Sequence, residues 1–455
     1  MDTLLVNPPI REWAKPNCVP IGLAYIAQCL RNAGHGVRVL DINGYRYPRD
    51  EVVRILEREE PDLVLTGGII TVFNYVKWLI GASREIHGAE VPVMVGGSVS
   101  TSIPEIALST LGADIACIGE GEVTTVEVAD ALEKERDLAG IRGIYYRRGD
   151  SIFRNDPRPP IMDMDTIPLP AYDLFPMEIY VSNPVGYINR DKWGSGERVG
   201  DAPRSTNINV SRGCPYRCGF CYHDYLGPGY RHRSPEHILG EMDLLHERYG
   251  VSYFLWADDE SVVNRRFIHE FCDLMIRSGR DYQFSISGRV NLMTGEMLAE
   301  LKTAGCTMVG YGIESGSQKI LDAMNKGVTV EQAKRAVRLT QQIFGDADCS
   351  FIIGYPGETD ETIRETEKFC RELDLAPEVI FFATAYPGTP LYLYARENGL
   401  IPDEVAYISK LWEQGERIAV NFTDWPDEVL FAKRQALIEG LKTWNQRRHG
   451  RDEAV

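Results

Sequence analysis

The chain has 455 residues, enough for about three domains, and its 44% hydrophobic and 25% charged residues are ordinary for a globular protein. No apolar run approaches the roughly 20 residues of a bilayer span, and the start MDTLLVNPPI lacks a secretory pattern, so we expect a cytoplasmic protein without membrane association. The net charge of -17 opposes binding to phosphate backbones, so we expect no nucleic-acid partner.

The first half of the chain alternates short apolar runs with amphipathic helical stretches. The runs are DTLLVN, VRVLDI, DLVLTGG, VPVMVGG and DIACIGEG. Near-continuous apolar strands separated by helices are typical of a parallel sheet that is covered on both faces. We therefore predict an α/β fold with a doubly wound, Rossmann-like domain over residues 1–140.

Glycines close three successive strands of this half, at the edge where open α/β sheets bind their ligands. They are Gly67, Gly68, Gly96, Gly97, Gly119 and Gly121, with Glu120 between the last two. Glycine lets the backbone approach a ligand closely, although a tight turn without a ligand also favours it. Because the pattern recurs at three strand ends, we predict that these residues line a ligand site.

Residues 141–203 interrupt the alternation and are predicted to form a linker, since a strand at GIYYRR is followed by a segment rich in proline and turn formers. The alternation then resumes in STNINVSRG, SYFLWADD, QFSISGR, CTMVGYGIES, DCSFIIGYPGE and EVIFFATAYPGT. Six such units suffice for a partial barrel with right-handed crossovers. We predict a partial (β/α)6 TIM-type barrel over residues 204–395 and a helical carboxyl-terminal region over 396–455.

Three of the ten cysteines are clustered in SRGCPYRCGFCY, which follows a predicted strand. Cys214, Cys218 and Cys221 would share one loop at the carboxyl end of that strand. Thiolates are the usual ligands of iron–sulfur clusters, which normally take four, so three would leave one iron open. Incidental cysteines and a zinc site completed by His223 are the alternatives, but structural zinc sites usually have two distant pairs of ligands, and the sequence has no second pair.

This cysteine spacing, with Phe220 before the third thiol, resembles the radical S-adenosylmethionine (SAM) superfamily over residues 205–390. The resemblance implies that the three thiolates hold a 4Fe–4S cluster whose open iron binds SAM. It also implies that an external electron donor serves the cluster and that cleavage of SAM yields a 5'-deoxyadenosyl radical, which abstracts hydrogen from a substrate. The Phe220 backbone would then face the adenine.

Two further strand ends match positions around the cofactor in this superfamily. Asp258 and Asp259 end the strand in WADDES, where the resemblance implies contact with an ammonium group; a helix cap is the alternative. Arg289 closes FSISGR, and its planar guanidinium suits the cofactor carboxylate, with a surface salt bridge as the alternative.

The later segments GIESGSQKILDAMNKG and FIIGYPGET continue the resemblance, the first in a form close to that of cobalamin-dependent members. Glu314 looks like the ribose-binding acid, because a carboxylate can accept hydrogen bonds from two hydroxyl groups. Gly354 and Gly357, with Glu358, resemble the stretch that lines the adenine. Each segment alone could be a turn, but their order favours the cofactor site.

The first half resembles the cobalamin-binding domain found ahead of many radical SAM enzymes. The match covers NPP, PIGLAYIAQCLRNAGHGVRVLD, VGGS and IGEGE within residues 1–140. It implies that the glycine-rich strand ends and Glu120 contact cobalamin. The DxHxxG motif that supplies a histidine to cobalt in other cobalamin enzymes is missing, and His35, in a helix-to-strand turn, is not expected to replace it.

The two resemblances together imply a cobalamin-dependent radical methyltransferase. One SAM would methylate reduced cobalt, and a second would yield the radical that prepares an unactivated substrate carbon for the methyl group. A radical cyclase or rearrangement enzyme acting on a small molecule, an RNA methylthiotransferase and a redox sensor are the alternatives. The expected substrate is a protein or peptide residue, such as glutamine in methyl-coenzyme M reductase, although similar enzymes act on lipids, antibiotics or phosphonates.

Overall fold

The computed structural model describes residues 1–11, 14–183, 203–222, 227, 229–411 and 415–449. The chain divides into two compact units. The first comprises residues 1–213, 224–255 and 405–411, and the second comprises residues 214–223, 256–404 and 412–455. In the described ranges, no helix combines the length and the apolar character needed to cross a bilayer.

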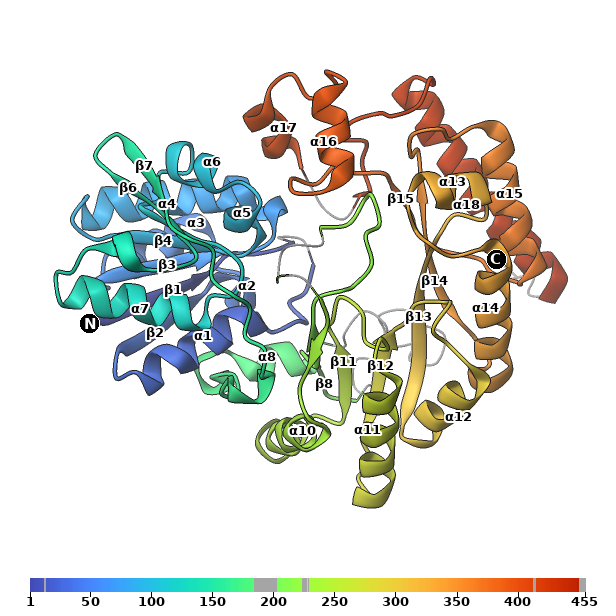
Figure 1. The fold of residues 1–455 in the computed structure, drawn as a ribbon, viewed down its shortest axis with the longest axis horizontal. Coiled ribbons are helices and arrows are strands. Elements are labelled where there is room, and N and C mark those ends of the chain that lie inside the picture. Colours follow the sequence, from blue (N-terminus) through green and yellow to red (C-terminus); the bar gives the residue numbers. More distant parts are fainter. Residues whose placement is uncertain (12–13, 184–202, 223–226, 228, 412–414, 450–455) are drawn as a thin grey trace. The chain divides into compact units, whose positions relative to one another are not determined.

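Within the described part of the first unit, a seven-stranded sheet has the order β2-β1-β3-β4-β5-β6-β7 (Figure 1). Its strands are β1 (Asp2–Asn7), β2 (Gly36–Asp41), β3 (Leu63–Gly67), β4 (Val93–Gly96), β5 (Ile115–Cys117), β6 (Ile144–Arg148) and β7 (Ser151–Arg154). Strands β1 to β5 pair in parallel, whereas β6 and β7 form an antiparallel edge. The predicted Rossmann-like sheet is confirmed, and β7, whose residues are all exposed, lies within the stretch expected to be a linker.

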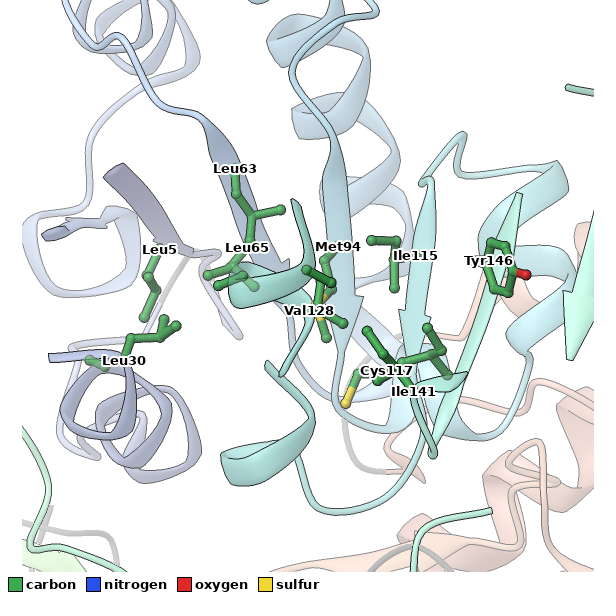
Figure 2. Close-up of a cluster of buried hydrophobic side chains, with 14 of the residues drawn as sticks. Leu5, Leu30, Leu63, Leu65, Met94, Ile115, Cys117, Val128, Ile141 and Tyr146 are labelled. Atoms are coloured by element: carbon green, nitrogen blue, oxygen red, sulfur yellow. The ribbon is translucent and has the colours of Figure 1, made fainter. Parts of the chain in front are cut away.

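Helices cover both faces of this sheet. Helices α1 (Ile21–Asn32) and α7 (Glu122–Glu133) pack together on one face, and α3 (Arg49–Leu56) and α4 (Phe73–His87) lie on the other (Figure 1). Under α1 and α7, the strand residues Leu5, Leu65 and Met94 meet Leu30 and Val128 of the helices (Figure 2). This burial holds the carboxyl ends of the parallel strands, and hence the expected ligand edge, in a fixed arrangement.

The remaining elements of the first unit are short. Its other helices are α2 (Ile42–Tyr45), α5 (Ser98–Thr101), α6 (Pro104–Ser109), α8 (Met177–Ser182), the longer α10 (Pro235–Tyr249) and α17 (Glu404–Lys410), which lies in this unit from residue 405 onward. Four 3₁₀ turns occupy Ile70–Val72, Leu138–Gly140, Met164–Thr166 and Tyr172–Leu174 in the described residues. A small ladder joins β9 (Ser211–Arg212) to β10 (Arg231–His232), on either side of the segment that contains the three clustered cysteines.

Among the described residues, a six-stranded sheet has the order β15-β14-β13-β12-β11-β8. Its strands are β8 (Ser205–Ile208), β11 (Tyr253–Trp256), β12 (Gln283–Ser287), β13 (Cys306–Glu314), β14 (Asp348–Ile353) and β15 (Ile380–Phe382). Each lies in one of the six predicted apolar runs. The pairs β12/β13, β13/β14 and β14/β15 are parallel, as a partial barrel requires.

In the second unit, helices alternate with the later strands of this sheet, β12 to β15, and cover their outer side (Figure 1). They are α11 (Arg265–Ser278), α12 (Gly295–Thr303), α13 (Gln318–Ala323), α14 (Val330–Phe344) and α15 (Asp360–Glu372). Helices α16 (Pro390–Glu397), α17 (Glu404–Lys410) and α18 (Asp427–His449) follow the last strand. The predicted partial barrel and helical carboxyl-terminal region are therefore confirmed.

Local sequence signals set the ends of these helices. At α14, the Thr329 side chain accepts from the Gln332 backbone N–H while the Gln332 side chain reaches back to the Thr329 N–H, which is a capping box. The same helix ends at Gly345, whose φ of +90° is a left-handed conformation that glycine adopts readily. Such signals fix where each strand-to-helix connection begins and ends.

Candidate functional site

The three clustered cysteines lie on one loop of the second unit, directly after the segment of β9. Cys218 is buried, Cys214 is half-buried and Cys221 is exposed. Backbone hydrogen bonds hold the loop at Gly219, whose N–H donates to the Met324 carbonyl at 2.7 Å and whose carbonyl accepts from the Leu391 N–H at 2.8 Å. The loop is therefore fixed between its second and third thiols.

The three thiols lie close enough to influence one another electrostatically. Desolvation, followed by the charges of Asp259, Cys218 and Cys214, raises the pKa of Cys221 to about 12. The thiol is thus neutral when no metal is bound, and metal binding must release its proton. Their shared loop and chemistry fit an iron–sulfur cluster.

No three His, Cys, Asp or Glu side chains in the described ranges lie in positions that could hold a metal ion. His223, the fourth ligand in the zinc alternative, lies outside the described residues. The assignment of Cys214, Cys218 and Cys221 as cluster ligands stays a prediction, which rests on their spacing and on the loop that they share.

Arg289 is buried beside the cysteine loop, with only 6% of its surface exposed, so it is not a surface residue. Its Nη1 lies 3.6 Å from the Cys218 sulfur, and its guanidinium stacks 3.7 Å from the centre of the Tyr216 ring. Its Nε is buried and has no hydrogen-bond partner among the described residues. Because a buried N–H without an acceptor is costly, this geometry fits the expected carboxylate ligand.

Glu314 ends β13 in a strained conformation. Its φ of +67° is unusual for a residue other than glycine, and the register between β13 and β14 shifts between Gly312 and Glu314. Strain of this kind is often concentrated at functional sites. A Cβ on Gly312 would lie 2.3 Å from Glu314 Oε1, so this glycine provides the space for the carboxylate.

Lys326 is a candidate functional residue that the sequence analysis did not identify. It follows α13 in AMNKG and is buried, with its Nζ 2.8 Å from Glu314 Oε1. The same Nζ lies 5.5 Å from the centre of the Phe220 ring, in the cysteine loop. The aromatic residue and the predicted ribose-binding acid are therefore joined by one buried cation.

Acidic residues follow β11, as expected, but the buried one is Glu260 rather than its neighbours. Asp258 is half-buried and Asp259 is exposed. Burial raises the pKa of Glu260 to about 7, although the backbone N–H groups of Val262 and Arg289 favour its charged form. The motif WADDES contains Glu260, but the sequence analysis selected the two aspartates before it.

The turn after β14 contains both predicted glycines in left-handed conformations. Gly354 has a φ of +81° and Gly357 a φ of +91°. The Gly354 N–H donates to Glu358 Oε2 at 3.2 Å, and the Thr362 hydroxyl donates to the same carboxylate. Glu358 thus joins the turn to the first residues of α15, while the contact of these glycines with adenine stays a prediction.

Glu358→Gln is expected to remove a pH-dependent loss of stability. Burial raises the pKa of Glu358 from its ordinary value of 4.5 to about 7. Between these values the folded protein keeps a proton that the unfolded chain releases, so stability falls as pH rises and has lost about 3 kcal/mol above pH 7. As pH rises from about 5 to 8, the unfolding midpoint of the unsubstituted protein should fall more steeply than that of the variant. The same pH dependence in both proteins would contradict this.

Two of the glycines at the strand ends of the first unit pack against neighbouring backbone. A Cβ on Gly67 would lie 2.1 Å from the Gly96 carbonyl oxygen, and one on Gly97 would lie 2.4 Å from the Gly68 carbonyl oxygen. Close contacts within the chain therefore explain why glycine is required at positions 67 and 97, and no ligand is needed to explain it. At Gly96 no atom of the described residues lies within 4 Å of the Cβ position, which leaves room for a ligand.

Gly96→Val is expected to weaken cobalamin binding, because no described atom lies within 4 Å of the Cβ position and the new side chain would project into the space left for the ligand. Gly81→Val in α4 is the matched control, since a Cβ there also meets no described atom. Cobalamin retention after gel filtration should fall about tenfold or more in the first variant alone, a loss of about 1.4 kcal/mol of binding energy. Equal retention by both variants would remove Gly96 from the site.

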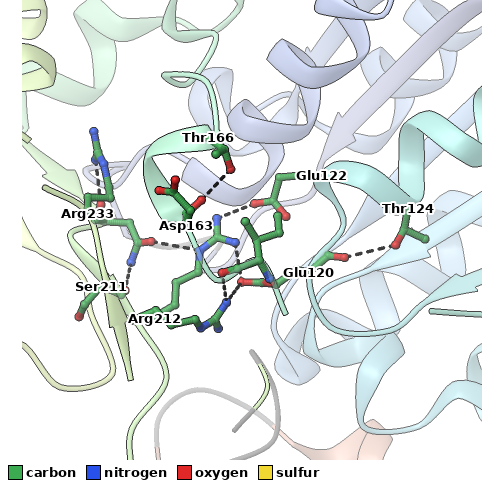
Figure 3. Close-up of polar contacts among 11 residues, drawn as sticks. Glu120, Glu122, Thr124, Asp163, Thr166, Ser211, Arg212 and Arg233 are labelled. Atoms are coloured by element: carbon green, nitrogen blue, oxygen red, sulfur yellow. Dashed lines mark hydrogen bonds and ion pairs between the residues drawn. The ribbon is translucent and has the colours of Figure 1, made fainter. Parts of the chain in front are cut away.

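Glu120 uses its carboxylate for ion pairs within the first unit. Its Oε1 accepts from both Arg212 and Arg231, as Figure 3 shows for Arg212. On either side of it, the Gly119 N–H donates to Thr101 Oγ1 at 3.0 Å, and a Cβ on Gly121 would lie 3.0 Å from Ile26 Cδ1. If this loop contacts cobalamin as predicted, its backbone would make the contact, because the Glu120 carboxylate is already bound to the two arginines.

Two family models match the chain, each within one of the predicted halves. Residues 10–129 match the B12 binding domain, and residues 208–370 match the radical SAM superfamily. Similarity to known proteins extends further. An uncharacterized methyltransferase from Pyrococcus horikoshii is 32% identical over 88% of this chain and 84% of its own length.

Two other proteins are similar to this chain over most of its length. The anaerobic magnesium-protoporphyrin IX monomethyl ester cyclase of Cereibacter sphaeroides is 26% identical over 85% of this chain and 62% of its own. The structure of the radical SAM methyltransferase TsrM from Kitasatospora setae, with cobalamin and a 4Fe-4S cluster bound, has a TM-score of 0.71 at 22% identity. It covers 88% of this chain and 76% of that one, and the match confirms the fold.

The two family models agree with the expected use of SAM and cobalamin, whereas the 4Fe-4S cluster is bound in the TsrM structure and stays a prediction for this chain. The residues that hold each cofactor remain predictions. The cysteine loop, the buried cations beside it and the sheet matched by the B12 model all belong to one chain. The protein is therefore a member of the radical SAM superfamily, in its cobalamin-dependent, methyltransferase-type branch.

Proposed function

We propose that the protein transfers a methyl group to an unactivated carbon. The observation that carries this proposal is the presence of a B12-binding domain and a radical SAM domain in one chain, along nearly all of which a relative named as a methyltransferase is similar. When bound, the cluster and SAM supply a hydrogen-abstracting radical, and cobalamin supplies a methyl carrier. The task of the chain is to bind these groups and direct them to one substrate atom.

The side chains of the second unit have chemistry suited to this task. Arg289 would bind the SAM carboxylate, which its buried Nε supports, and Glu314 would accept hydrogen bonds from the ribose. Lys326 would orient the Glu314 carboxylate through their ion pair. The remaining proposed SAM contacts are Phe220, Asp258, Asp259, Gly354 and Gly357.

Methyl-labelled SAM tests the proposal in the anaerobically reconstituted protein. The product should gain one labelled methyl group in place of a hydrogen. S-adenosylhomocysteine, 5'-deoxyadenosine and methionine should form in equal amounts, because one SAM supplies the methyl group and a second supplies the radical. SAM cleavage with label found only in methionine, and in no methylated substrate, would contradict methyl transfer.

Radical cyclisation without net methyl transfer is the second candidate. Its support is the similarity of 85% of this chain to the cyclase from Cereibacter sphaeroides. In this case the product would lose hydrogen and carry no label, although 5'-deoxyadenosine would still accumulate. The same labelling experiment therefore separates the two functions.

For the substrate, we propose a carbon in a protein or peptide residue, as the resemblance to protein-modifying enzymes implies. A peptide library incubated with the reconstituted protein and labelled SAM should yield peptides heavier by one methyl group. The peptide proposal is wrong if SAM is cleaved without any change in the peptides, while a small molecule in an extract of the cells that produce the protein becomes labelled.

A further inference from the structure

The segment that carries the three cysteines is closed at its base by the ladder between β9 and β10. Arg212 in β9 lies opposite Arg231 in β10. Immediately after this pair, Gly213 has a φ of +79°, and a Cβ on it would lie 2.2 Å from the Gly229 carbonyl oxygen. The two arms of the loop therefore meet at a narrow neck with an arginine on each side.

Two carboxylates bind these arginines. Glu120 Oε1 accepts from Arg212 Nη1 at 2.9 Å and from Arg231 Nη1 at 2.7 Å, and Glu122 Oε1 accepts from Arg212 Nη2. Figure 3 shows Glu120 and Glu122 directed at the Arg212 guanidinium. Like charges directly opposite in a ladder repel each other, so the carboxylates make this pairing of arginines stable.

The group is buried and electrically balanced. Each of the four side chains is at most 8% exposed, and the two positive charges match the two negative ones. Glu120 Oε2 also accepts from the Ile161 N–H, while Arg231 donates to the Ile161 carbonyl at 2.8 Å. Neutralising Glu120 would leave an excess cation in a site of low dielectric constant, which the neck could relieve only by moving.

Glu120 and Glu122 come from the loop that joins β5 to α7. Glu122 is the first residue of α7, where the helix dipole favours a negative charge. Glu120 lies between Gly119 and Gly121, and Thr124 donates to its carbonyl. The two acids in IGEGE therefore reach an element almost a hundred residues further along the chain, and their direction is set by the start of a helix.

We propose that Glu120 and Glu122 are positioning residues for the cysteine loop, and that their carboxylates do not bind cobalamin. By holding Arg212 and Arg231, they fix the neck from which Cys214, two residues after Arg212, is presented to the cluster. The proposal rests on this loop holding the cluster and is independent of the substrate that the protein modifies.

Glu120→Gln in the reconstituted holoenzyme is the test, with Asp114→Asn as the matched control. Asp114 lies at the opposite end of β5, where its carboxylate binds Arg84 and the Val93 N–H. In the presence of a chelator, the Glu120 variant should lose iron about tenfold faster than the unsubstituted protein. Effects of about this size are typical of changes to residues that support a metal ligand without binding the metal. The electron paramagnetic resonance (EPR) spectrum of its reduced cluster should also shift. The control should match the unsubstituted protein in both measurements, and cobalamin retention should stay unchanged in both variants.

Iron release and an EPR spectrum like those of the unsubstituted protein would overturn the proposal, and so would loss of cobalamin with an intact cluster. If Glu120→Gln does not fold, Glu122→Gln decides by the same criteria with a smaller effect, because Glu122 contacts only Arg212 among the four charged groups. Failure to methylate any substrate would not move these measurements, so the proposed function and this inference fail separately.

Discussion

Cys218→Ala is expected to abolish cluster binding and SAM cleavage. Cys218 is the buried thiol of the three, and Arg289 Nη1 lies 3.6 Å from its sulfur. With three protein ligands for four irons, loss of one leaves a second iron without a thiolate, and alanine cannot replace it. The iron content and the formation of 5'-deoxyadenosine in the reconstituted variant should both fall to the level of protein prepared without iron.

Cys272→Ala is the control for this result. Cys272 is buried in α11 of the same unit and lies outside the cysteine loop. Its truncation removes a small apolar group, so we expect a loss of stability of about 1 kcal/mol with full iron content. Continued SAM cleavage by Cys218→Ala, or loss of iron from both variants, would refute the assignment of the thiols.

The sequence predicted the strands well because burial leaves a periodic signal. Each of the six runs expected in the barrel contains a strand of its sheet, since apolar residues there are continuous or alternate with the pleat. Strand β7 was missed because its four residues, SIFR, are all exposed and pair only with β6 at the sheet edge. An edge strand that buries no side chain has no hydrophobic pattern to detect.

The side chains around the cysteine loop were predicted less completely, because their roles depend on contacts distant in sequence. Lys326 has no motif of its own and gains importance from an ion pair with Glu314, twelve positions earlier. Glu120 was predicted as a ligand because it lies between glycines at a strand end, yet its carboxylate binds Arg212 and Arg231, which are 92 and 111 positions away. Motif spacing identifies a loop, whereas the direction of each side chain depends on tertiary packing.

Lys326→Met is expected to destabilise the second unit by about 3–5 kcal/mol, because it leaves the buried Glu314 carboxylate without its cation. Adding Glu314→Gln to this variant should recover much of the loss, since it removes the unpaired charge. Lys368→Met is the matched control: Lys368 and Glu372 form an exposed pair at 3.8 Å, for which we expect at most about 1 kcal/mol. Unfolding midpoints in urea measure all three variants.

The same variants separate a structural ion pair from a cofactor site. Glu314→Gln alone should weaken SAM binding about tenfold or more, because an amide oxygen accepts less strongly than a carboxylate from the two ribose hydroxyls. The double variant should recover stability but not SAM affinity, since the proposed ribose acceptor is still neutral. Equilibrium dialysis with SAM measures this. Recovery of both properties in the double variant would mean that the pair only stabilises the fold, and Glu314 would no longer be a candidate for binding the cofactor.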